Sequence, residues 1–199
     1  MGLLAGTRLV ALDTETTGMS PAQGASLVEV ATVTIENGAI GTTWSSLIRP
    51  ASAIPPDAVR VHGITDAMVA DAPEPAAIAR PLRAAMGDLP LVFHNASFDL
   101  PFLTELMRAS GQPPVWNPVV DTLGLARGLF EPGGNSLSSL AVRLGLPAVT
   151  AHRALADALT TARVFLALAA RWEAERGVLS LPELAAASQD VMRLSASRR

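Results

Sequence analysis

Three apolar, β-branched stretches at the start of the chain predict strands. They read TRLVALDTE, SLVEVATVTI and IGTTWSSLI, and they are rich in residue types that favour extended backbone. The short connection ENGA separates the second stretch from the third, and its Asn37-Gly38 pair is a strong signal for a two-residue hairpin turn. We therefore expect antiparallel strands in this part of the chain.

Further along, predicted strands alternate with predicted helices. LPLVFHN and VWNPVVDT read as strands, each followed by a helical stretch, and Gly111 and Gly177 end two of the later helices. The helical stretch AAIARPLRAAM contains Pro81, which we expect to interrupt it and to begin a second segment. Ser136 is placed to cap the helix LSSLAVRLG. This order predicts an α/β fold, with a mixed five-stranded sheet (three antiparallel strands, then two parallel ones) and helices on both faces.

The final segment is expected to form a short helix and a tail. We assign residues 1–176 to one domain and residues 177–199 to this C-terminal helix and tail. Ser180 and Glu183 have the spacing of a capping box, and Pro182 stands early in the helix, where proline is favoured.

Two acids interrupt the first apolar strand. Asp13 and Glu15 are two positions apart, so both point to one side of the strand and Thr14 points to the other. Two carboxylates side by side repel each other and resist burial, so a positive charge is expected between them. Two interpretations are open at this point. The acids either bind a cation or lie at an open strand end, where water or arginine satisfies them.

Three more polar residues lie in or just before later helices. Asp99 falls in the first turn of a helix that follows a strand, where the helix N-terminus favours an ionised carboxylate without any further function. Asp157 lies in a helix that is apolar on nearly all sides, so its carboxylate needs a partner. His152 precedes it by five residues, a rotation of about 140° on a helix, and is expected at the helix start or in the loop before it. The alternative is an exposed acid and a surface histidine.

Taken together, the acids predict a metal site. Carboxylates on a central strand, at a helix start and in a late helix can converge on two divalent ions. Ligands that are all oxygen suit Mg²⁺ or Mn²⁺ rather than zinc. Two such ions about 3.5–4 Å apart stabilise both the attacking and the leaving oxygen of an in-line phosphoryl displacement.

Composition excludes several other classes of protein. The chain has 199 residues, of which 49% are hydrophobic, enough for one substantial core. Its net charge of −3 argues against a protein that coats nucleic acid non-specifically. The apolar runs are too short for a membrane span, and MGLLAGTR lacks the features of a signal peptide. Cysteine is absent, which excludes disulfides and thiolate metal sites and fits a reducing, cytoplasmic location.

Three motifs in the chain resemble those of a known nuclease family. DTETTG, HNASFD and HRALADALTTARVF resemble the three motifs of the DEDDh 3′–5′ exonucleases, which include the proofreading (epsilon) subunits of bacterial DNA polymerase III. VHGIT and DTLGLAR also look like family segments, and the resemblance runs from about Arg8 to Trp172. It implies a ribonuclease H-like fold. It also implies an enzyme that removes nucleoside 5′-monophosphates from the 3′ ends of single-stranded DNA, in proofreading or repair.

The resemblance also implies roles for individual residues. Asp13, Glu15, Asp99 and Asp157 would hold two Mg²⁺ or Mn²⁺ ions, and His152 would be the general base that deprotonates the attacking water. A sister subgroup uses tyrosine in place of this histidine, and the chain contains no tyrosine.

Further residues match family positions around the 3′-terminal nucleotide. The pocket for this nucleotide is expected to be lined by Thr16, Thr17, Gly18 and Met19. By the same resemblance, the scissile end is expected to be flanked by His62 and Asn95, with Phe98 stacked on a base.

Three other functions share some of these features. A haloacid-dehalogenase-type phosphatase begins with an apolar strand and D-x-D-x-T, here Asp13, Glu15 and Thr17. That class needs a later lysine, and all 15 basic residues of this chain are arginine. A non-catalytic nucleic-acid-binding module on the same fold usually lacks one or more of the acids, and all four are present. A 3′–5′ exoribonuclease shares the motifs, and no residue type reveals whether a 2′-hydroxyl is admitted.

The C-terminal segment also predicts a protein partner. QDVMRL resembles the short peptides by which replication proteins dock on the bacterial sliding clamp, with Gln189, Met192 and Leu194 at the matching positions. A capped amphipathic helix explains the same residues. The expected partners are therefore a single-stranded nucleic acid end and the sliding clamp or polymerase.

Overall fold

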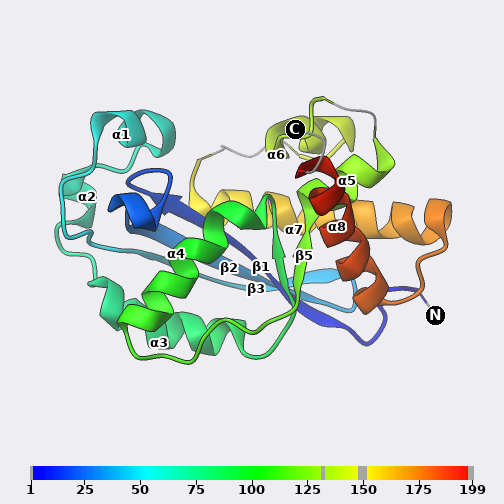
Figure 1. Cartoon of the computed structure of the whole chain (residues 1–199), viewed down its shortest axis with the longest axis horizontal. Coiled ribbons are helices and arrows are strands. Elements are labelled where there is room, and N and C mark those ends of the chain that lie inside the picture. The colour runs from blue at the N-terminus through cyan, green and yellow to red at the C-terminus, as the bar shows by residue number, and fades with distance from the viewer. Residues whose placement is uncertain (1, 131–132, 148–151, 197–199) are drawn as a thin grey trace.

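A five-stranded sheet forms the centre of the molecule (Figure 1). The computed structural model describes residues 2–130, 133–147 and 152–196. In the sheet order β3-β2-β1-β4-β5, the strands are β3 Ala39–Leu47, β2 Leu27–Glu36, β1 Arg8–Thr16, β4 Leu91–Phe93 and β5 Val119–Asp121.

The pairing of the strands confirms the predicted mixed sheet. β1 pairs with β2 and β2 with β3 in antiparallel register, whereas β4 runs parallel to β1 and β5 parallel to β4. The hairpin between β2 and β3 turns at Asn37 and Gly38, whose φ angles are 53° and 77°. Positive φ at both central residues is what a type I′ turn requires. The carboxyl ends of β1, β4 and β5 therefore open on one edge of the sheet.

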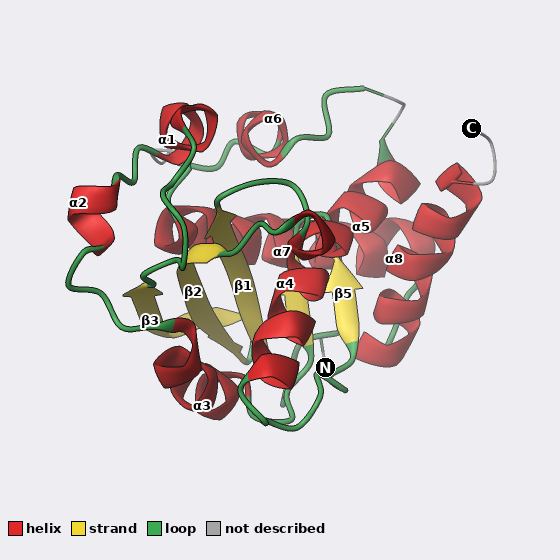
Figure 2. Ribbon diagram, turned by 60° about the vertical axis from the view of Figure 1, so that its left-hand side comes forward, coloured by secondary structure: helices red, strands yellow, loops and turns green. Residues whose placement is uncertain are grey.

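Helices cover both faces of the sheet, as predicted (Figure 2). In chain order, the helices are α1 Pro56–His62, α2 Asp66–Val69, α3 Pro75–Met86, α4 Ala96–Ala109, α5 Thr122–Leu129, α6 Leu137–Arg143, α7 Ala154–Arg176 and α8 Leu181–Ala196, and a short 3₁₀ helix, η1, spans Pro21–Gln23. One apolar core lies between the sheet and the layer of α5, α7 and α8, and a second lies between the sheet and α3 and α4.

Alternation along β1 determines which core each of its side chains enters. Leu9 and Ala11 belong to the core under α7, whereas Val10 and Leu12 belong to the core under α3 and α4. Continuing the same period of two, Asp13 and Glu15 are on the α7 side of the sheet and Thr14 is on the α4 side.

Two local predictions need correction. Pro81 does not interrupt its helix, because α3 runs without a break from Pro75 to Met86. Pro81 lies on the solvent side of α3 while Ile78 and Leu82 are buried, so burial of the apolar face keeps the helix intact and water can satisfy the carbonyl that proline leaves free. Ser180 Oγ accepts from the amide of Glu183 at 3.4 Å, but the Glu183 carboxylate accepts from Leu179, not from Ser180. The reciprocal bond of the capping box therefore reaches one residue further back than predicted.

The C-terminal segment contains α8, which packs closely on α5 and β5 (Figure 1). Leu184 and Ser188 are fully buried, and the amide of Asp121 on β5 donates to Ser188 Oγ at 3.1 Å. A Cβ atom on Gly124 of α5 would lie 2.0 Å from the Ser188 carbonyl oxygen, so glycine is required for this approach. None of the helices in the described part of the chain combines the length and apolar character that crossing a bilayer requires.

Candidate active site

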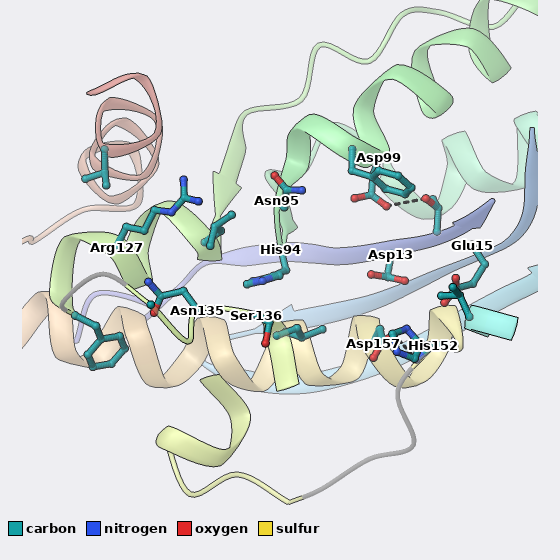
Figure 3. Close-up of a pocket in the computed structure, with 18 residues that line it drawn as sticks. Asp13, Glu15, His94, Asn95, Asp99, Arg127, Asn135, Ser136, His152 and Asp157 are labelled. Atoms are coloured by element: carbon teal, nitrogen blue, oxygen red, sulfur yellow. Dashed lines mark hydrogen bonds between the residues drawn. The ribbon is translucent and has the colours of Figure 1, made fainter. Parts of the chain in front are cut away.

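Three of the predicted acids meet at the carboxyl end of β1. Asp13 and Glu15 point from β1 toward α7, and Asp157 lies in the first turn of α7. One carboxylate oxygen from each of these three residues lies within 4.8 Å of the others. Figure 3 shows Asp13 and Asp157 turned toward one another across the cleft. Three residues from two distant segments therefore share a site small enough for a cation.

Asp99 reaches the same cleft from the other side of β1. It lies in the first turn of α4, as predicted, and its side chain is buried. Thr14, on the α4 side of β1, donates from Oγ1 to Asp99 Oδ1 at 2.7 Å (Figure 3). Asp99 is not among the three acids that meet within 4.8 Å. It lines the same cavity, and Thr14 fixes one of its oxygens and leaves the other to face the cleft.

His152 immediately precedes α7 and lies beside Asp157 (Figure 3). The backbone amide of His152 donates to Asp157 Oδ2 at 2.7 Å, and its φ angle of 67° places it in the left-handed region. The imidazole side chain is exposed and lines the cleft. The position in the loop before the helix agrees with the one expected from the five-residue spacing.

Glu29 of β2 holds the start of α7 in place. Its carboxylate accepts from Arg153 Nε at 3.0 Å, from Arg153 Nη2 at 2.7 Å and from the amide of Ala154 at 2.9 Å. Glu29 is also the direct cross-strand partner of Glu15. The sequence analysis missed this residue, although an acid inside the apolar run LVEVATV was a visible signal. Its contacts connect the acid pair on β1 to the segment that carries His152.

The site has an excess of negative charge. Burial and, after it, the charges of Asp99, Asp157 and Glu15 raise the pKa of Asp13 well above its usual range. Burial is also the largest cause for Glu15, whose pKa rises to about 8, and for Asp99, whose pKa rises to about 7 despite the hydrogen bond from Thr14. The pKa of Asp157 is raised by burial too. Several buried acids with raised pKa values are the electrostatic condition that a divalent cation relieves.

The loop that follows β1 contains the residues predicted to hold the terminal nucleotide. Thr16 Oγ1 donates to the Gly18 carbonyl at 2.7 Å, and the Ser26 amide donates to Thr17 Oγ1 at 2.9 Å. The side chain of Met19 is 76% exposed. These bonds fix the loop beside Glu15 and leave an apolar methionine side chain accessible to a ligand.

His62 is buried at the end of α1. Its Nδ1 accepts from the Ile64 amide at 3.0 Å, which leaves the proton of the neutral ring on Nε2. Nε2 is buried without a hydrogen-bond partner of normal geometry among the described residues. Burial lowers the pKa of His62, and the nearby Thr16 backbone opposes this effect. His62 therefore lies behind the Thr16 backbone and packs the end of α1 against the loop that follows β1.

Asn95 and Phe98 lie at the β4–α4 junction. Asn95 has a φ of 69° at the N-terminus of α4, and both residues line the cleft. Asp121, at the end of β5, accepts from the amides of Asn95 and Ala96, each at 3.0 Å, and from that of Leu123 at 2.9 Å. Asp121 was also missed, and its position directly after the apolar strand residues PVV was the available signal. It fixes the starts of α4 and α5 at the same edge of the sheet.

The cleft as a whole has a volume of about 970 Å³. It extends beyond the four acids, past His94 and Asn95, to residues of α5, α6 and α8. Sequence reasoning did not predict this extension. Its lining residues there are Leu123, Arg127, Phe130, Gly133, Asn135, Ser136, Leu137 and Val191.

The predicted clamp-binding residues are located on α8. Gln189 and Met192 are half-buried, and Met192 Sδ accepts from Arg127 Nη1 at 3.2 Å. The side chain of Leu194 lies outside the part of the chain that the structure describes. These residues are therefore helical, and one of them contacts the body of the domain.

Comparison with known proteins finds one family and many relatives. The model of the RNase_T family, described as exonuclease, matches residues 10–165. A DNA polymerase III subunit epsilon-like protein of Rhodobacter capsulatus is 42% identical over 164 residues, which cover 80% of this chain and 23% of that protein. The PolC-type DNA polymerase III of Bacillus cereus is 36% identical over 160 residues, which cover 80% of this chain and 11% of that protein. The chain thus spans less than a quarter of these two relatives.

A shorter relative and one solved structure are matched over most of their own length, and a second solved structure is matched over less than half of its length. DNA polymerase III subunit epsilon of Treponema pallidum is 34% identical over 170 residues, covering 84% of this chain and 79% of that protein. Exonuclease X in complex with 5′ overhanging duplex DNA has a TM-score of 0.70 and 29% identity, covering 90% of this chain and 99% of that one. Exonuclease I of E. coli in complex with a dA16 oligonucleotide has a TM-score of 0.74, but its 20% identity, over 90% of this chain and 42% of that one, shows a common fold only.

Proposed function

The chain belongs to the RNase_T exonuclease family, and from that premise we propose that it is a metal-dependent 3′–5′ exonuclease. Its substrate in this proposal is the 3′ end of single-stranded DNA, and its product is a nucleoside 5′-monophosphate. One observation carries the proposal: Asp13, Glu15 and Asp157 bring carboxylate oxygens within 4.8 Å of one another at the mouth of a cleft. Asp99 lines the same cleft.

The donor set fits two hard divalent cations such as Mg²⁺ or Mn²⁺. Every candidate ligand is a carboxylate oxygen, and these ions prefer oxygen ligands. The guanidinium of Arg153, whose charge lowers the pKa of Glu15, is hydrogen-bonded to Glu29 and not to Asp13. When bound, two such ions would activate water and stabilise the charge on the attacking and leaving oxygens.

His152 is assigned the role of general base. Its imidazole is exposed at the cleft, and the bond from its backbone amide to Asp157 Oδ2 holds the segment next to the acids. In hydrolysis, His152 accepts a proton from the attacking water as the water oxygen bonds to phosphorus. The bond from phosphorus to the 3′-oxygen breaks, and that oxygen takes up a proton as the new 3′-hydroxyl of the shortened strand.

The loop after β1 and the end of α1 are assigned to the 3′-terminal nucleotide. Thr16, Thr17 and Gly18 are tied to one another or to the start of β2, so the backbone there is rigid. The exposed Met19 side chain offers an apolar surface to a base, and the buried His62 supports the Thr16 backbone from behind. Asn95 and Phe98 are assigned to the nucleotide on the other side of the scissile phosphate, with Phe98 as a stacking surface.

We place this activity in DNA replication or repair, in the cytoplasm. Two of the relatives are named as epsilon or epsilon-like subunits of DNA polymerase III, so proofreading beside a polymerase is part of the proposal. Docking on the sliding clamp through Gln189, Met192 and Leu194 is a further part. Because Met192 contacts α5, we expect the end of α8 to separate from α5 on docking. Gln189→Ala should abolish clamp binding in a pull-down, and binding by Gln189→Ala equal to that of the intact chain would contradict the idea.

Digestion of labelled oligonucleotides tests the proposed function. DNA and RNA oligonucleotides with a 5′ label, single- and double-stranded, are incubated with Mg²⁺ or with EDTA. We expect a ladder of shortened single-stranded DNA products in Mg²⁺ and none in EDTA. If only the RNA oligonucleotides were shortened, the substrate would be RNA and not DNA. Binding without any shortening would identify a non-catalytic module and refute the enzyme.

A further inference from the structure

The cleft has a second, basic end that the proposed chemistry does not use. Figure 3 shows the four acids at one end, His94 and Asn95 in the middle, and Arg127 with Asn135 at the other end. We call this end the distal arm and define it as Arg127, Phe130, Asn135, Ser136 and Val191, all of which line the cleft.

Arg127 is the charged residue of the distal arm, and within residues 2–130, 133–147 and 152–196 no carboxylate pairs with it. Its Nη1 donates to the thioether sulfur of Met192 at 3.2 Å, and a thioether is a weak acceptor. The side chain is half-buried at the end of α5. Most of the N–H donors of this guanidinium are therefore available to bind an anion.

The surroundings of Arg127 add to the positive charge and hold the arm rigid. Arg143 donates from Nη1 to Asn135 Oδ1 and from Nη2 to the Gly133 carbonyl, each at 3.3 Å. The Arg143 and Arg171 guanidinium groups each lie 4.8 Å from the centre of the Phe130 ring. Asn135 lies near Arg127, and Ser136 lies between Asn135 and the middle of the cleft (Figure 3). Arg127 lines this end of the cleft, while Arg143 and Arg171 lie behind it against Phe130, and Arg171 is also paired with Glu175.

Helix α8 completes the distal arm. Its Val191 lines the cleft, and its Met192 accepts the hydrogen bond from Arg127. The close approach of α8 to α5 at Gly124 fixes this arrangement. The C-terminal helix thus contacts the arginine and contributes one lining residue to the same end of the cleft.

We propose that the distal arm binds a backbone phosphate of the nucleic acid strand upstream of the scissile bond. The inference rests on the proposed function, which places the terminal nucleotide beyond Glu15, at the end of the cleft remote from Arg127. A strand with its scissile phosphate at the acids then runs past His94 and Asn95 toward Arg127. A phosphodiester matches the planar, bidentate geometry of a guanidinium, and Asn135, whose Oδ1 accepts from Arg143, can donate a neutral hydrogen bond to it from its amide nitrogen. This phosphate is common to DNA and RNA, so the arm favours longer strands of either kind.

The test compares substrates of different length. In the wild type, kcat/KM should rise from a dinucleotide to a twelve-residue strand, because only the longer strand reaches the distal arm. In Arg127→Ala, the increase in kcat/KM from the short to the long strand should be about tenfold smaller, as expected for the loss of one charge-assisted bond. Most of this effect should come from a higher KM for the longer strand. Arg127→Lys should restore part of the rise. The control is Arg108→Ala, which removes an exposed arginine paired with Glu105 on α4 and should keep the wild-type length dependence. Oligo-dT and oligo-rU series show whether both nucleic acids use the arm.

Salt dependence and a charge reversal give two further readouts. Loss of one phosphate contact should reduce the slope of log affinity against log salt by about 0.7 for a single strand. Fluorescence anisotropy measures the affinity at several salt concentrations. Both proteins compared carry Asp157→Asn, which prevents hydrolysis of the strand, and one of them also carries Arg127→Ala. Asn135→Asp adds a negative charge to the distal arm without changing the size of the side chain. It should therefore also weaken binding of the longer strand. Equal effects of Arg127→Ala on short and long strands, or an unchanged salt slope, would overturn the proposal. No hydrolysis of any strand by the wild type, combined with an Arg127-dependent salt slope, would refute the proposed function and leave the distal arm supported.

Discussion

Arg153 and Glu29 join α7 to β2 through two hydrogen bonds, from Nε to Oε2 at 3.0 Å and from Nη2 to Oε1 at 2.7 Å. The same carboxylate accepts from the Ala154 amide. His152 is one residue before this attachment and Asp157 is four residues after it. The pair therefore determines where the start of α7 lies relative to the acids of β1.

Neutralising Glu29 should lower both stability and turnover. In Glu29→Gln, the charge-assisted bonds to Arg153 weaken, and we expect a loss of about 1–3 kcal/mol in the free energy of unfolding. Because His152 and Asp157 then move relative to Asp13, kcat should fall about tenfold while KM changes little. Urea unfolding and steady-state kinetics measure the two effects. Glu36→Gln is the control, since Glu36 is on the same strand in an exposed pair with Arg8; equal effects of the two substitutions would contradict a positioning role for Glu29.

Neutralising Asp13 should stabilise the metal-free protein and inactivate the enzyme. The charges of Asp99, Asp157 and Glu15 all raise the pKa of Asp13, so Asp13→Asn relieves repulsion without changing the size of the side chain. We expect Tm in EDTA to rise by a few degrees and turnover in Mg²⁺ to fall on the order of 10³-fold. Thermal unfolding and the oligonucleotide assay check both parts. A lower Tm in EDTA would show that the acids do not repel one another as described.

Stability of the metal-free protein should fall as pH rises from 7 to 9. The pKa values of Asp99 and Glu15 are raised to about 7 and about 8, far above the values near 4 of an unfolded chain. Their contribution to stability is therefore complete below pH 4 and is lost as pH rises through these folded values. The pKa values of His62 and His94 are lowered, so their effect has the opposite sign but is complete near pH 7.

Metal should remove this pH dependence. Divalent ions favour the ionised carboxylates, so in saturating Mg²⁺ the decrease in Tm between pH 7 and 9 should be much smaller than in EDTA. Thermal scans in both conditions across this range make the comparison. A Tm in EDTA that stays constant or rises would contradict the raised pKa values at the site.

Replacing His152 should slow the chemical step. Asn tolerates the positive φ of this position and keeps the backbone amide that Asp157 accepts from, so His152→Asn removes the imidazole with little strain. We expect kcat to fall about 10²–10⁴-fold with a much smaller change in KM. Retention of the Mg²⁺-induced rise in Tm is the control that the acids remain in place. If kcat stayed at the wild-type value across pH 6–9, His152 would have no part in proton transfer.

Local signals in the sequence predicted the sheet and the positions of the acids. Asn37-Gly38 marked the hairpin because few residues adopt positive φ, and alternation along β1 separated Asp13 and Glu15 from Thr14. The prediction of a break at Pro81 was wrong because proline costs less stability on the exposed face of a helix. In α3, Pro81 is on the exposed face, and burial of the opposite, apolar face stabilises the helix.

Features that depend on packing between distant segments were not predicted. Glu29 and Arg153 are 124 positions apart, and Asp121 and Asn95 are 26 apart. Their contacts exist only once β2 lies under α7 and β5 beside β4. The role of α8 was missed for the same reason, since only the assembled fold shows that Gly124 admits Ser188 at close range. The distal arm is formed by residues in or next to α5, α6 and α8, and no local sequence pattern predicts it.

Titration with Mn²⁺ tests the central claim most directly. The claim is that Asp13, Glu15, Asp99 and Asp157 hold the two ions that support hydrolysis. Isothermal titration in the presence of a nucleoside 5′-monophosphate should find two Mn²⁺ per wild-type chain and at most one per Asp157→Asn chain, with turnover lost in the variant. Full turnover by Asp157→Asn in Mn²⁺, or a wild-type chain that binds no Mn²⁺ while still hydrolysing DNA, would contradict it.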